Sequence, residues 1–265
     1  MSQTLKSLAK LALSARRATF RPSAQERPLI ILGNGPGLRG ALDSERAALD
    51  ASPLMAVNFF ANTPEFRELR PEFYVLADPH FFAKKDDPNV CRLLRELAAV
   101  DWPMTLFIPF GAPAPEGSAL RIERYPLTAA VGAEWLEDAA YDARRGMPRP
   151  RNVLIPSIMI GAWLGFREIY LAGADHSWPR TVSVNERNEV VSVQPHFYKE
   201  DGRELERIRE TYLGVRLHEL LESWRIAFRS YHRIQRWASK RGIRIYNSTP
   251  GSFIDAFARK PLPQP

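Results

Sequence analysis

Cysteine and long apolar runs are scarce in this sequence, and each shortage excludes a class of protein. The 265 residues contain a single cysteine, Cys91, so no internal disulfide can form, and no Cys/His grouping has the spacing of a zinc site. No apolar run reaches the ~18 residues that a membrane-spanning helix requires. We therefore expect a protein of the reducing cytoplasm, with no integral membrane helix and no metal site.

The excess of positive charge is moderate and is spread along the chain. Lysine and arginine number 37 against 30 acidic residues, a net charge of +7, and the 45% of hydrophobic residues is typical of a globular protein. No basic stripe is interleaved with aromatic residues, so a nucleic-acid partner is not predicted. An anionic small substrate or an anionic membrane surface accounts better for the charge.

Residues 2–17 have a pattern of their own, which predicts a short basic amphipathic helix. Its apolar residues are Leu5, Leu8, Leu11 and Ala12, and its basic residues are Lys6, Lys10, Arg16 and Arg17. Such a helix lies on an anionic membrane, packs on its own domain or forms the contact of a homo-oligomer, and all three alternatives stay open. Pro22 and the polar residues up to position 27 predict a linker.

From Pro28 onward, predicted strands alternate with predicted helices. The strands are expected at 29–32, 55–60, 73–77, 104–108, 121–125, 168–172 and 243–246, and the helices at 38–51, 89–100 and 153–165. Short apolar strands separated by helices indicate a parallel sheet that is covered on both faces. The predicted fold class is therefore α/β, with a Rossmann-like, mostly parallel sheet and helices on both of its faces.

Two departures from this alternation follow the sixth predicted strand. Residues 181–184 and 190–193 are rich in β-formers and predict a small hairpin, or lid, within about 177–201. An apolar stripe with steps of three or four then predicts a long C-terminal helix from about 202 to 240. The predicted division of the chain is an N-terminal helix with its linker (1–27), one Rossmann-like domain that includes the lid (28–260) and a proline-rich tail (261–265).

A glycine-rich loop follows the first predicted strand and precedes a helix. It contains Gly33, Asn34, Gly35 and Pro36. Glycines permit a tight turn and a close approach of the backbone to a ligand, and free amides at a helix start attract phosphate. The loop is neither the dinucleotide fingerprint nor a Walker A motif, because no Lys-Ser/Thr follows it. We predict that the loop binds a nucleotide phosphate; the alternative is a glycine-rich turn with no ligand.

Polar residues repeatedly follow the predicted strands. Those expected at carboxyl ends of strands are Asn58, Asp78, Gly173, Asp175 and His176. Open α/β sheets bind ligands in the crevice at these ends, so we assign the first four to nucleotide binding and His176 to catalysis. An aspartate at a strand end also serves as the N-cap of the next helix, which is the alternative for Asp78 and Asp175.

The predicted lid carries a candidate general base, His196. A lid histidine can close over a substrate and titrates near neutral pH, and its rivals for this role are His80 and His176. The candidate substrate-binding residues are Tyr198, Thr249 and Ser252. The last two precede a helix that is predicted to run through Phe257, where hydroxyls and amides suit an anion or a sugar; the alternative for Ser252 is a helix N-cap.

Four stretches of the sequence resemble bacterial sialyltransferases of glycosyltransferase family 42. They are GNGPGL after the first strand, VNFF in the second, LGFREIYLAGADHSW around the sixth and RIYNSTPGSFID near the end. The same stretches resemble a wider group labelled 6-hydroxymethylpterin pyrophosphokinase-like, often found as polysaccharide-biosynthesis proteins. The resemblance spans roughly residues 28–257, and the N-terminal helix lies outside it.

The resemblance implies roles for individual residues. In the sialyltransferases the glycine-rich loop and the asparagine after the second strand hold the CMP part of the donor, a lid histidine deprotonates the acceptor hydroxyl, and no metal is needed. By resemblance, the CMP-holding residues are Gly33, Asn34, Gly35 and Asn58, and the base is His196. The chain departs from the family at Gly37, where the family has serine, and it lacks the tyrosines that hold the donor phosphate after Asp175.

The leading hypothesis is a glycosyltransferase of bacterial surface-polysaccharide or lipopolysaccharide biosynthesis, located in the cytoplasm at the periphery of the inner membrane. It would transfer a sugar from a nucleotide-sugar donor, a CMP-sugar by resemblance, to a glycan acceptor without a metal or another cofactor. The chain has no Asp-x-Asp triplet, with which many glycosyltransferases hold a metal. The alternatives are an ATP- and Mg²⁺-dependent pyrophosphokinase-like phosphotransferase, with Asp78 and Asp175 as metal ligands, and a non-catalytic nucleotide- or sugar-binding subunit.

Overall fold

The computed structural model describes residues 2–264 except 15, 85, 116–119, 193–196 and 198–213. The strands are β1 Leu29–Leu32, β2 Leu54–Val57, β3 Phe73–Val75, β4 Thr105–Pro109, β5 Arg121–Tyr125, β6 Glu168–Ala172, β7 Ser183–Val184, β8 Val190–Val191, β9 Arg244–Asn247 and β10 Ala258–Arg259. The α-helices are α1 Gln3–Ser14, α2 Leu38–Ser44, α3 Arg46–Ala51, α4 Glu65–Leu69, α5 His80–Ala83, α6 Pro88–Ala98, α7 Glu134–Asp142, α8 Leu154–Leu164 and α10 Leu217–Ser239. Short 3₁₀ helices occupy Asn58–Asn62 and Trp178–Arg180.

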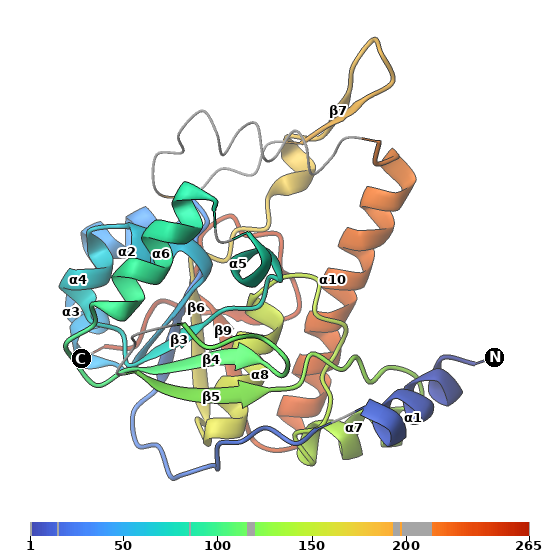
Figure 1. Cartoon of the computed structure of the whole chain (residues 1–265), viewed down its shortest axis with the longest axis horizontal. Coiled ribbons are helices and arrows are strands. Elements are labelled where there is room, and N and C mark those ends of the chain that lie inside the picture. The colour runs from blue at the N-terminus through green and yellow to red at the C-terminus, as the bar shows by residue number, and fades with distance from the viewer. Residues whose placement is uncertain are drawn as a thin grey trace.

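Eight strands form one sheet in the order β10-β9-β6-β1-β2-β3-β4-β5, and every neighbouring pair is parallel. The chain runs outward from β1 to β5 and then crosses back, so that β6 lies on the other side of β1. Helices cover both faces of the sheet (Figure 1). The predicted α/β, Rossmann-like fold class is therefore confirmed.

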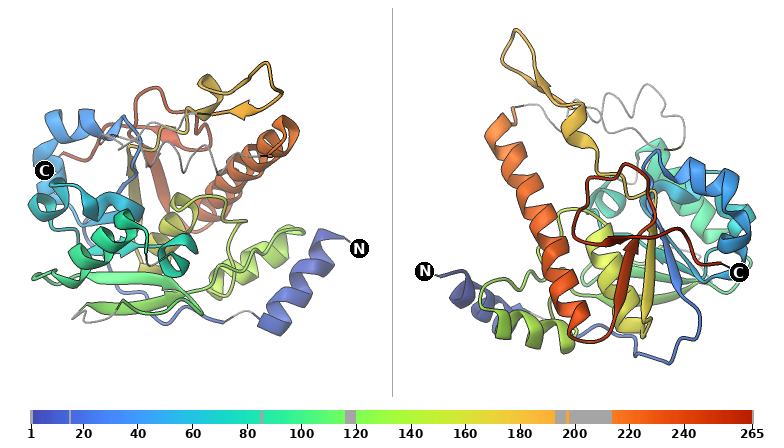
Figure 2. Two further views of the ribbon diagram at one scale, coloured as in Figure 1. Left: turned by 45° about the horizontal axis from the view of Figure 1, so that its top comes forward. Right: turned by 180° about the vertical axis from the view of Figure 1, so that it is seen from behind.

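Side chains that alternate along each strand supply two separate cores. In β1, Leu29 and Ile31 pack toward α8 and α10, whereas Ile30 and Leu32 pack toward the layer of α2 to α6. All four residues are completely buried, which explains why this strand is a continuous apolar run. Gly161 lets α8 approach β1 closely, because a Cβ there would lie 2.7 Å from Leu29 Cδ2. Figure 2 shows the sheet between these two layers of helices.

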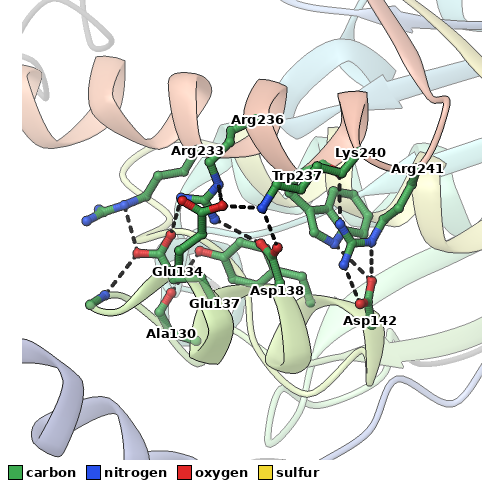
Figure 3. Close-up of polar contacts among 12 residues, drawn as sticks. Ala130, Glu134, Glu137, Asp138, Asp142, Arg233, Arg236, Trp237, Lys240 and Arg241 are labelled. Carbon is green, nitrogen blue, oxygen red and sulfur yellow. Dashed lines mark hydrogen bonds and ion pairs between the residues drawn. The ribbon is translucent and has the colours of Figure 1, made fainter.

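An ionic interface joins α7 to the C-terminal half of α10 (Figure 3). Glu137 is fully buried; its carboxylate accepts hydrogen bonds from the Gly132 amide (2.9 Å) and Arg236 Nη1 (2.9 Å) and forms an ion pair with Arg233 Nε (3.0 Å). Three donors therefore offset the desolvation of this charge. The outer pairs of the interface are Glu134–Lys240, Asp138–Arg236, Asp138–Lys240 and Asp142–Arg241.

The N-terminal helix α1 packs on its own chain while leaving apolar residues exposed. Ser7 is buried, and its hydroxyl donates to Val131 O (2.7 Å) and accepts from Val131 N (3.0 Å). Leu5 and Leu13 of α1 are 54% and 88% exposed, and Trp135 of α7 is exposed as well. The predicted amphipathic helix is present. Among the described residues, no helix combines the length and apolar character needed to cross a bilayer.

Other sequence-based predictions are confirmed or corrected at specific places. β7 and β8 form the predicted antiparallel hairpin, which projects from the body of the molecule in Figure 1. The long helix α10 begins at Leu217 rather than near residue 202, after Gly214 in a left-handed conformation (φ +78°) and the extended Arg216. Residues 202–213 of the predicted helix lie outside the described residues. The helix predicted after Ser252 is wrong: this stretch is a loop that leads to β10.

Candidate functional site

The loops that follow β1 and β6 meet at the point where the chain reverses direction across the sheet. Gly33 N donates to Ala172 O (2.7 Å), and Gly35 N donates to Gly173 O (2.9 Å). A Cβ at Gly33 would lie only 2.5 Å from Gly173 O, so this contact requires glycine. In open α/β sheets the crevice at such a switch point is the usual ligand site.

The carboxylate of Asp175 lies at the start of α2, where the sequence predicted a phosphate. Both of its oxygens accept from Gly37 N, at 3.0 and 3.1 Å. Burial raises the pKa of Asp175, and the Gly37 hydrogen bond opposes that rise. The fold itself also requires glycine at position 35, whereas the predicted approach of a ligand phosphate to this glycine stays a prediction. A Cβ there would lie 2.1 Å from Asp175 Oδ2 and would clash with the β6 loop itself.

A cavity of about 540 Å³ opens beside these loops. Its volume is within the range of small-molecule sites, roughly 300–1,000 Å³. The predicted site residues that line it are Gly33, Asn34, Gly35, Pro36, Asn58, Asp78, Gly173, Asp175 and His176. Asp78 also accepts from His80 N (2.9 Å) at the first residue of α5, so it acts as a helix cap as well. The strand-end residues thus share one crevice.

Three half-buried asparagines that line the cavity each have one buried amide atom without a partner among the described residues. These atoms are Asn34 Oδ1, Asn58 Oδ1 and Asn152 Nδ2. Asn34 is fixed by its other amide atom, because Nδ2 donates to Val57 O (3.2 Å). Asn58 is held in a left-handed conformation (φ +50°), which is uncommon outside glycine. Buried polar atoms are nearly always paired in folded proteins, so these three indicate a polar ligand.

A chain of hydrogen bonds fixes the protonation of His176. Leu154 N donates to Asn152 Oδ1 (3.0 Å), which orients that amide, and the Tyr231 hydroxyl donates to the same oxygen (2.9 Å). His176 Nε2 lies 2.7 Å from the Tyr231 hydroxyl, whose only hydrogen is already used, so Nε2 carries the proton. The ring also stacks on Trp178, with centroids 4.1 Å apart. Burial lowers the pKa of His176 to about 3, which keeps the imidazole neutral.

Thr249 and Ser252 support the β6 loop from behind and do not line the cavity. The Thr249 hydroxyl accepts from Ala174 N (2.9 Å), and the Ser252 hydroxyl donates to Ala174 O (2.6 Å). Ser252 Oγ also accepts from Asn247 Nδ2 (2.9 Å). Both hydroxyls are therefore engaged within the fold and hold the loop that carries Asp175.

The predicted lid residues His196 and Tyr198 lie outside the described residues, but Phe197 between them is described. Its backbone amide donates to Asn34 O (3.1 Å), and its buried ring lies 5.7 Å from that of Phe60, between centroids. Arg39 lies over the same ring, 5.5 Å from its centroid. The chain after β8 is thus attached to the glycine-rich loop at this residue.

Sequence reasoning missed Asn152, Arg151 and Tyr231. Asn152 and Arg151 line the cavity from the segment before α8, and Tyr231 reaches His176 from α10. An asparagine two residues before an apolar helix is a cap signal that could have drawn attention to Asn152. Within the described residues, no group of three or more His, Cys, Asp and Glu side chains lies close enough together to hold a metal ion.

Comparison with known proteins adds one similarity of fold. No protein-family model matches the chain, and no curated protein matches it. Among solved structures it is similar to a Maf glycosyltransferase from Magnetospirillum magneticum AMB-1, with a TM-score of 0.53 and 12% identity. The match covers 97% of this chain but 37% of the other, so the chain spans little more than a third of that protein. At this identity the similarity establishes a shared fold.

Proposed function

We propose that the chain is a glycosyltransferase whose nucleotide-sugar donor binds in the strand-end cavity. The observation that carries the proposal is that Asn34, Asn58 and Asn152 all line that cavity and that each has one buried amide atom without a partner among the described residues, namely Asn34 Oδ1, Asn58 Oδ1 and Asn152 Nδ2. The two oxygens accept hydrogen bonds, so a phosphate, which is also an acceptor, would leave both unpaired at a cost of roughly 1–3 kcal/mol each. The ribose hydroxyls and the amino group of a nucleobase supply the required donors.

Charge supports a donor with a single phosphate. Among the described side chains that line the cavity, Arg151 is the only permanent cation, and Asp78 and Asp175 are carboxylates. The phosphodiester of a CMP-sugar carries one negative charge, which a single guanidinium can balance. A triphosphate would bring further charge toward two carboxylates. A CMP-sugar is therefore the proposed donor, in agreement with the resemblance to the sialyltransferases.

The same proposal covers the acceptor, the location of the enzyme in the cell and the remaining residues of the site. The acceptor is a glycan of bacterial surface polysaccharide or lipopolysaccharide, and the enzyme acts in the cytoplasm at the inner membrane. The outward Leu5 and Leu13 of α1, with Lys6 between them in sequence, support contact with an anionic lipid surface. The resemblance implies His196 as the base, and the predicted lid offers Tyr198 as a substrate contact; both residues lie outside the described residues, and both assignments stay predictions. No metal or other cofactor takes part.

Calorimetric titration with CMP and with ATP, each with and without Mg²⁺, tests the proposal. We expect CMP to bind without Mg²⁺ and Asn152→Asp to weaken that binding by ~10-fold, because the change keeps the acceptor Oδ1 and removes the free donor. Asn62→Asp is the control for the change of amide to carboxylate, since Asn62 lies outside the cavity. Its folding is checked by thermal unfolding, because Asn62 Nδ2 donates to Asn89 O (3.0 Å) and the change removes that hydrogen bond. Metal-dependent binding of ATP alone would support the phosphotransferase. Binding of CMP without transfer from any donor would support a non-catalytic subunit.

A further inference from the structure

His80 and Asp87 form a hydrogen-bonded pair at the β3 side of the cavity. His80 Nε2 lies 3.1 Å from Asp87 Oδ2, and His80 lines the cavity from the first turn of α5. The other oxygen of Asp87, Oδ1, accepts from Asn89 N (2.8 Å) and Val90 N (3.3 Å) at the start of α6. Two backbone amides therefore hold the carboxylate in place, and the carboxylate in turn orients the imidazole.

The protonation of the pair follows from these contacts. Partial burial acts to raise the pKa of Asp87, but hydrogen bonds from the two α6 amides and from His80 outweigh it, so the pKa lies below its ordinary value. The carboxylate is ionised at neutral pH and can only accept, so His80 Nε2 carries the hydrogen. The lone pair is on Nδ1, which has no hydrogen-bond partner in the part of the chain that the structure describes. A carboxylate that fixes the tautomer of a histidine in this way is the arrangement of base and orienting group in catalytic triads.

The two described histidines that line the cavity differ in their capacity as bases. His176 is buried against Trp178 and Tyr231, where an imidazolium would be desolvated and without a carboxylate. The side chain of His80 is 22% exposed, and Asp87 would stabilise its imidazolium. The other charged groups around the cavity in the described residues are Asp78, Asp175 and Arg151. Efficient proton transfer needs a base whose charged form is tolerated.

We infer that His80, oriented by Asp87, is the general base that deprotonates the acceptor hydroxyl; the inference rests on the proposed glycosyl transfer. The acceptor oxygen forms a bond to the anomeric carbon of the donor sugar while its proton passes to His80 Nδ1. The bond from that carbon to the phosphate oxygen breaks, and its electron pair leaves with the nucleotide phosphate. Asp87 stabilises the imidazolium, which then releases the proton to water.

The experiment compares six purified proteins whose folding is checked by thermal unfolding. They are the wild type, His80→Ala, Asp87→Asn, His176→Ala, His196→Ala and His232→Ala. The His232–Asp255 pair has the same 3.1 Å spacing but lies on exposed surface outside the cavity, which makes it a matched control. CMP release from CMP-N-acetylneuraminate is measured with a panel of glycan acceptors, together with the affinity for CMP.

We expect His80→Ala to lower kcat by ~100-fold or more, with CMP affinity unchanged and with turnover partly restored by added imidazole. Asp87→Asn retains an oxygen to cap α6 but presents an amide N–H₂ to Nε2 and so forces the other tautomer. It should also lower kcat and should displace the acidic limb of its pH profile, which a merely structural role would not do. The control His232→Ala should behave as the wild type.

Several results would overturn the assignment. Wild-type turnover in folded His80→Ala, with loss of turnover in His196→Ala or His176→Ala, would transfer the role of base to that histidine. A loss in His80→Ala that imidazole does not restore, accompanied by weaker CMP binding, would make His80 a binding residue. If the wild type itself releases no CMP with any acceptor, the proposed glycosyl transfer fails and the assignment fails with it. This outcome can be told apart from a wrong choice of base, because it leaves the wild type inactive, whereas a wrong choice of base leaves the wild type active.

Discussion

Acidification should destabilise the folded chain through His176. Burial lowers the pKa of this imidazole from 6.5 to about 3, and unfolding restores the ordinary value. Below a pH of about 6.5 the unfolded chain binds a proton that the folded chain does not, so the stabilisation present above that pH is lost progressively as the pH falls toward 3. One pKa unit corresponds to ~1.4 kcal/mol, so the ~1.5 units between 6.5 and a pH of about 5 predict a loss of ~2 kcal/mol.

Urea unfolding of the wild type and of His176→Asn, at about pH 7.5 and about pH 5, measures this contribution. Asparagine does not titrate and tolerates the left-handed backbone of position 176 (φ +48°). The variant also loses the contact with Trp178, but that loss is common to both pH values and cancels in the comparison. We expect the wild type to lose ~2 kcal/mol more than the variant. Equal losses would mean that the folded chain protonates His176 readily, which would refute the buried, neutral imidazole.

Three further changes test the ionic interface, the N-terminal helix and the glycine-rich loop. In a urea titration, Glu137→Gln should lower the free energy of unfolding by ~3 kcal/mol, because it leaves two guanidinium groups without their buried carboxylate. The control Glu222→Gln removes an exposed ion pair and should have little effect. Replacement of Leu5 and Leu13 by glutamine should reduce co-sedimentation with anionic vesicles at low salt and leave CMP affinity unchanged; undiminished sedimentation would favour an oligomer contact. Gly35→Val should abolish CMP binding by displacing the β6 loop, and wild-type affinity in the folded variant would remove the glycine-rich loop from the site.

The central strands of the sheet could be predicted from the sequence because they are buried on both faces and form continuous apolar runs. β1, β5 and β6 match their predicted ranges residue for residue. The start of α10 was predicted too early, because the apolar stripe continues upstream of Gly214 while the backbone there turns left-handed. The helix predicted after Ser252 failed for a different reason. The Ser252 hydroxyl bonds to Ala174 O, 78 residues away in sequence, and no local pattern contains that contact.

The site could be predicted in part. The rule that ligands bind at strand carboxyl ends selected Asn58, Asp78 and Asp175 before their proximity was known, and all three line one cavity. Tyr231 could not be found in this way. It lies in the apolar stripe of α10, where its spacing is that of a core residue, and only the folded chain brings its hydroxyl to His176. Residues that orient a functional group from a distant element leave no local signature in the sequence.

The ionic interface between α7 and α10 has a consequence for the cavity. Tyr231 lies two positions before Arg233 in α10, so the contacts of Glu137 with this helix also fix the height at which the tyrosine hydroxyl meets His176. Salt screens the exposed outer pairs of the interface more than the buried Glu137. Rising ionic strength should therefore loosen the end of α10 at Lys240 and Arg241 first, while Arg233 and Arg236 stay paired with Glu137. The buried carboxylate thus insulates the contact of Tyr231 with His176 from the ionic conditions at the protein surface.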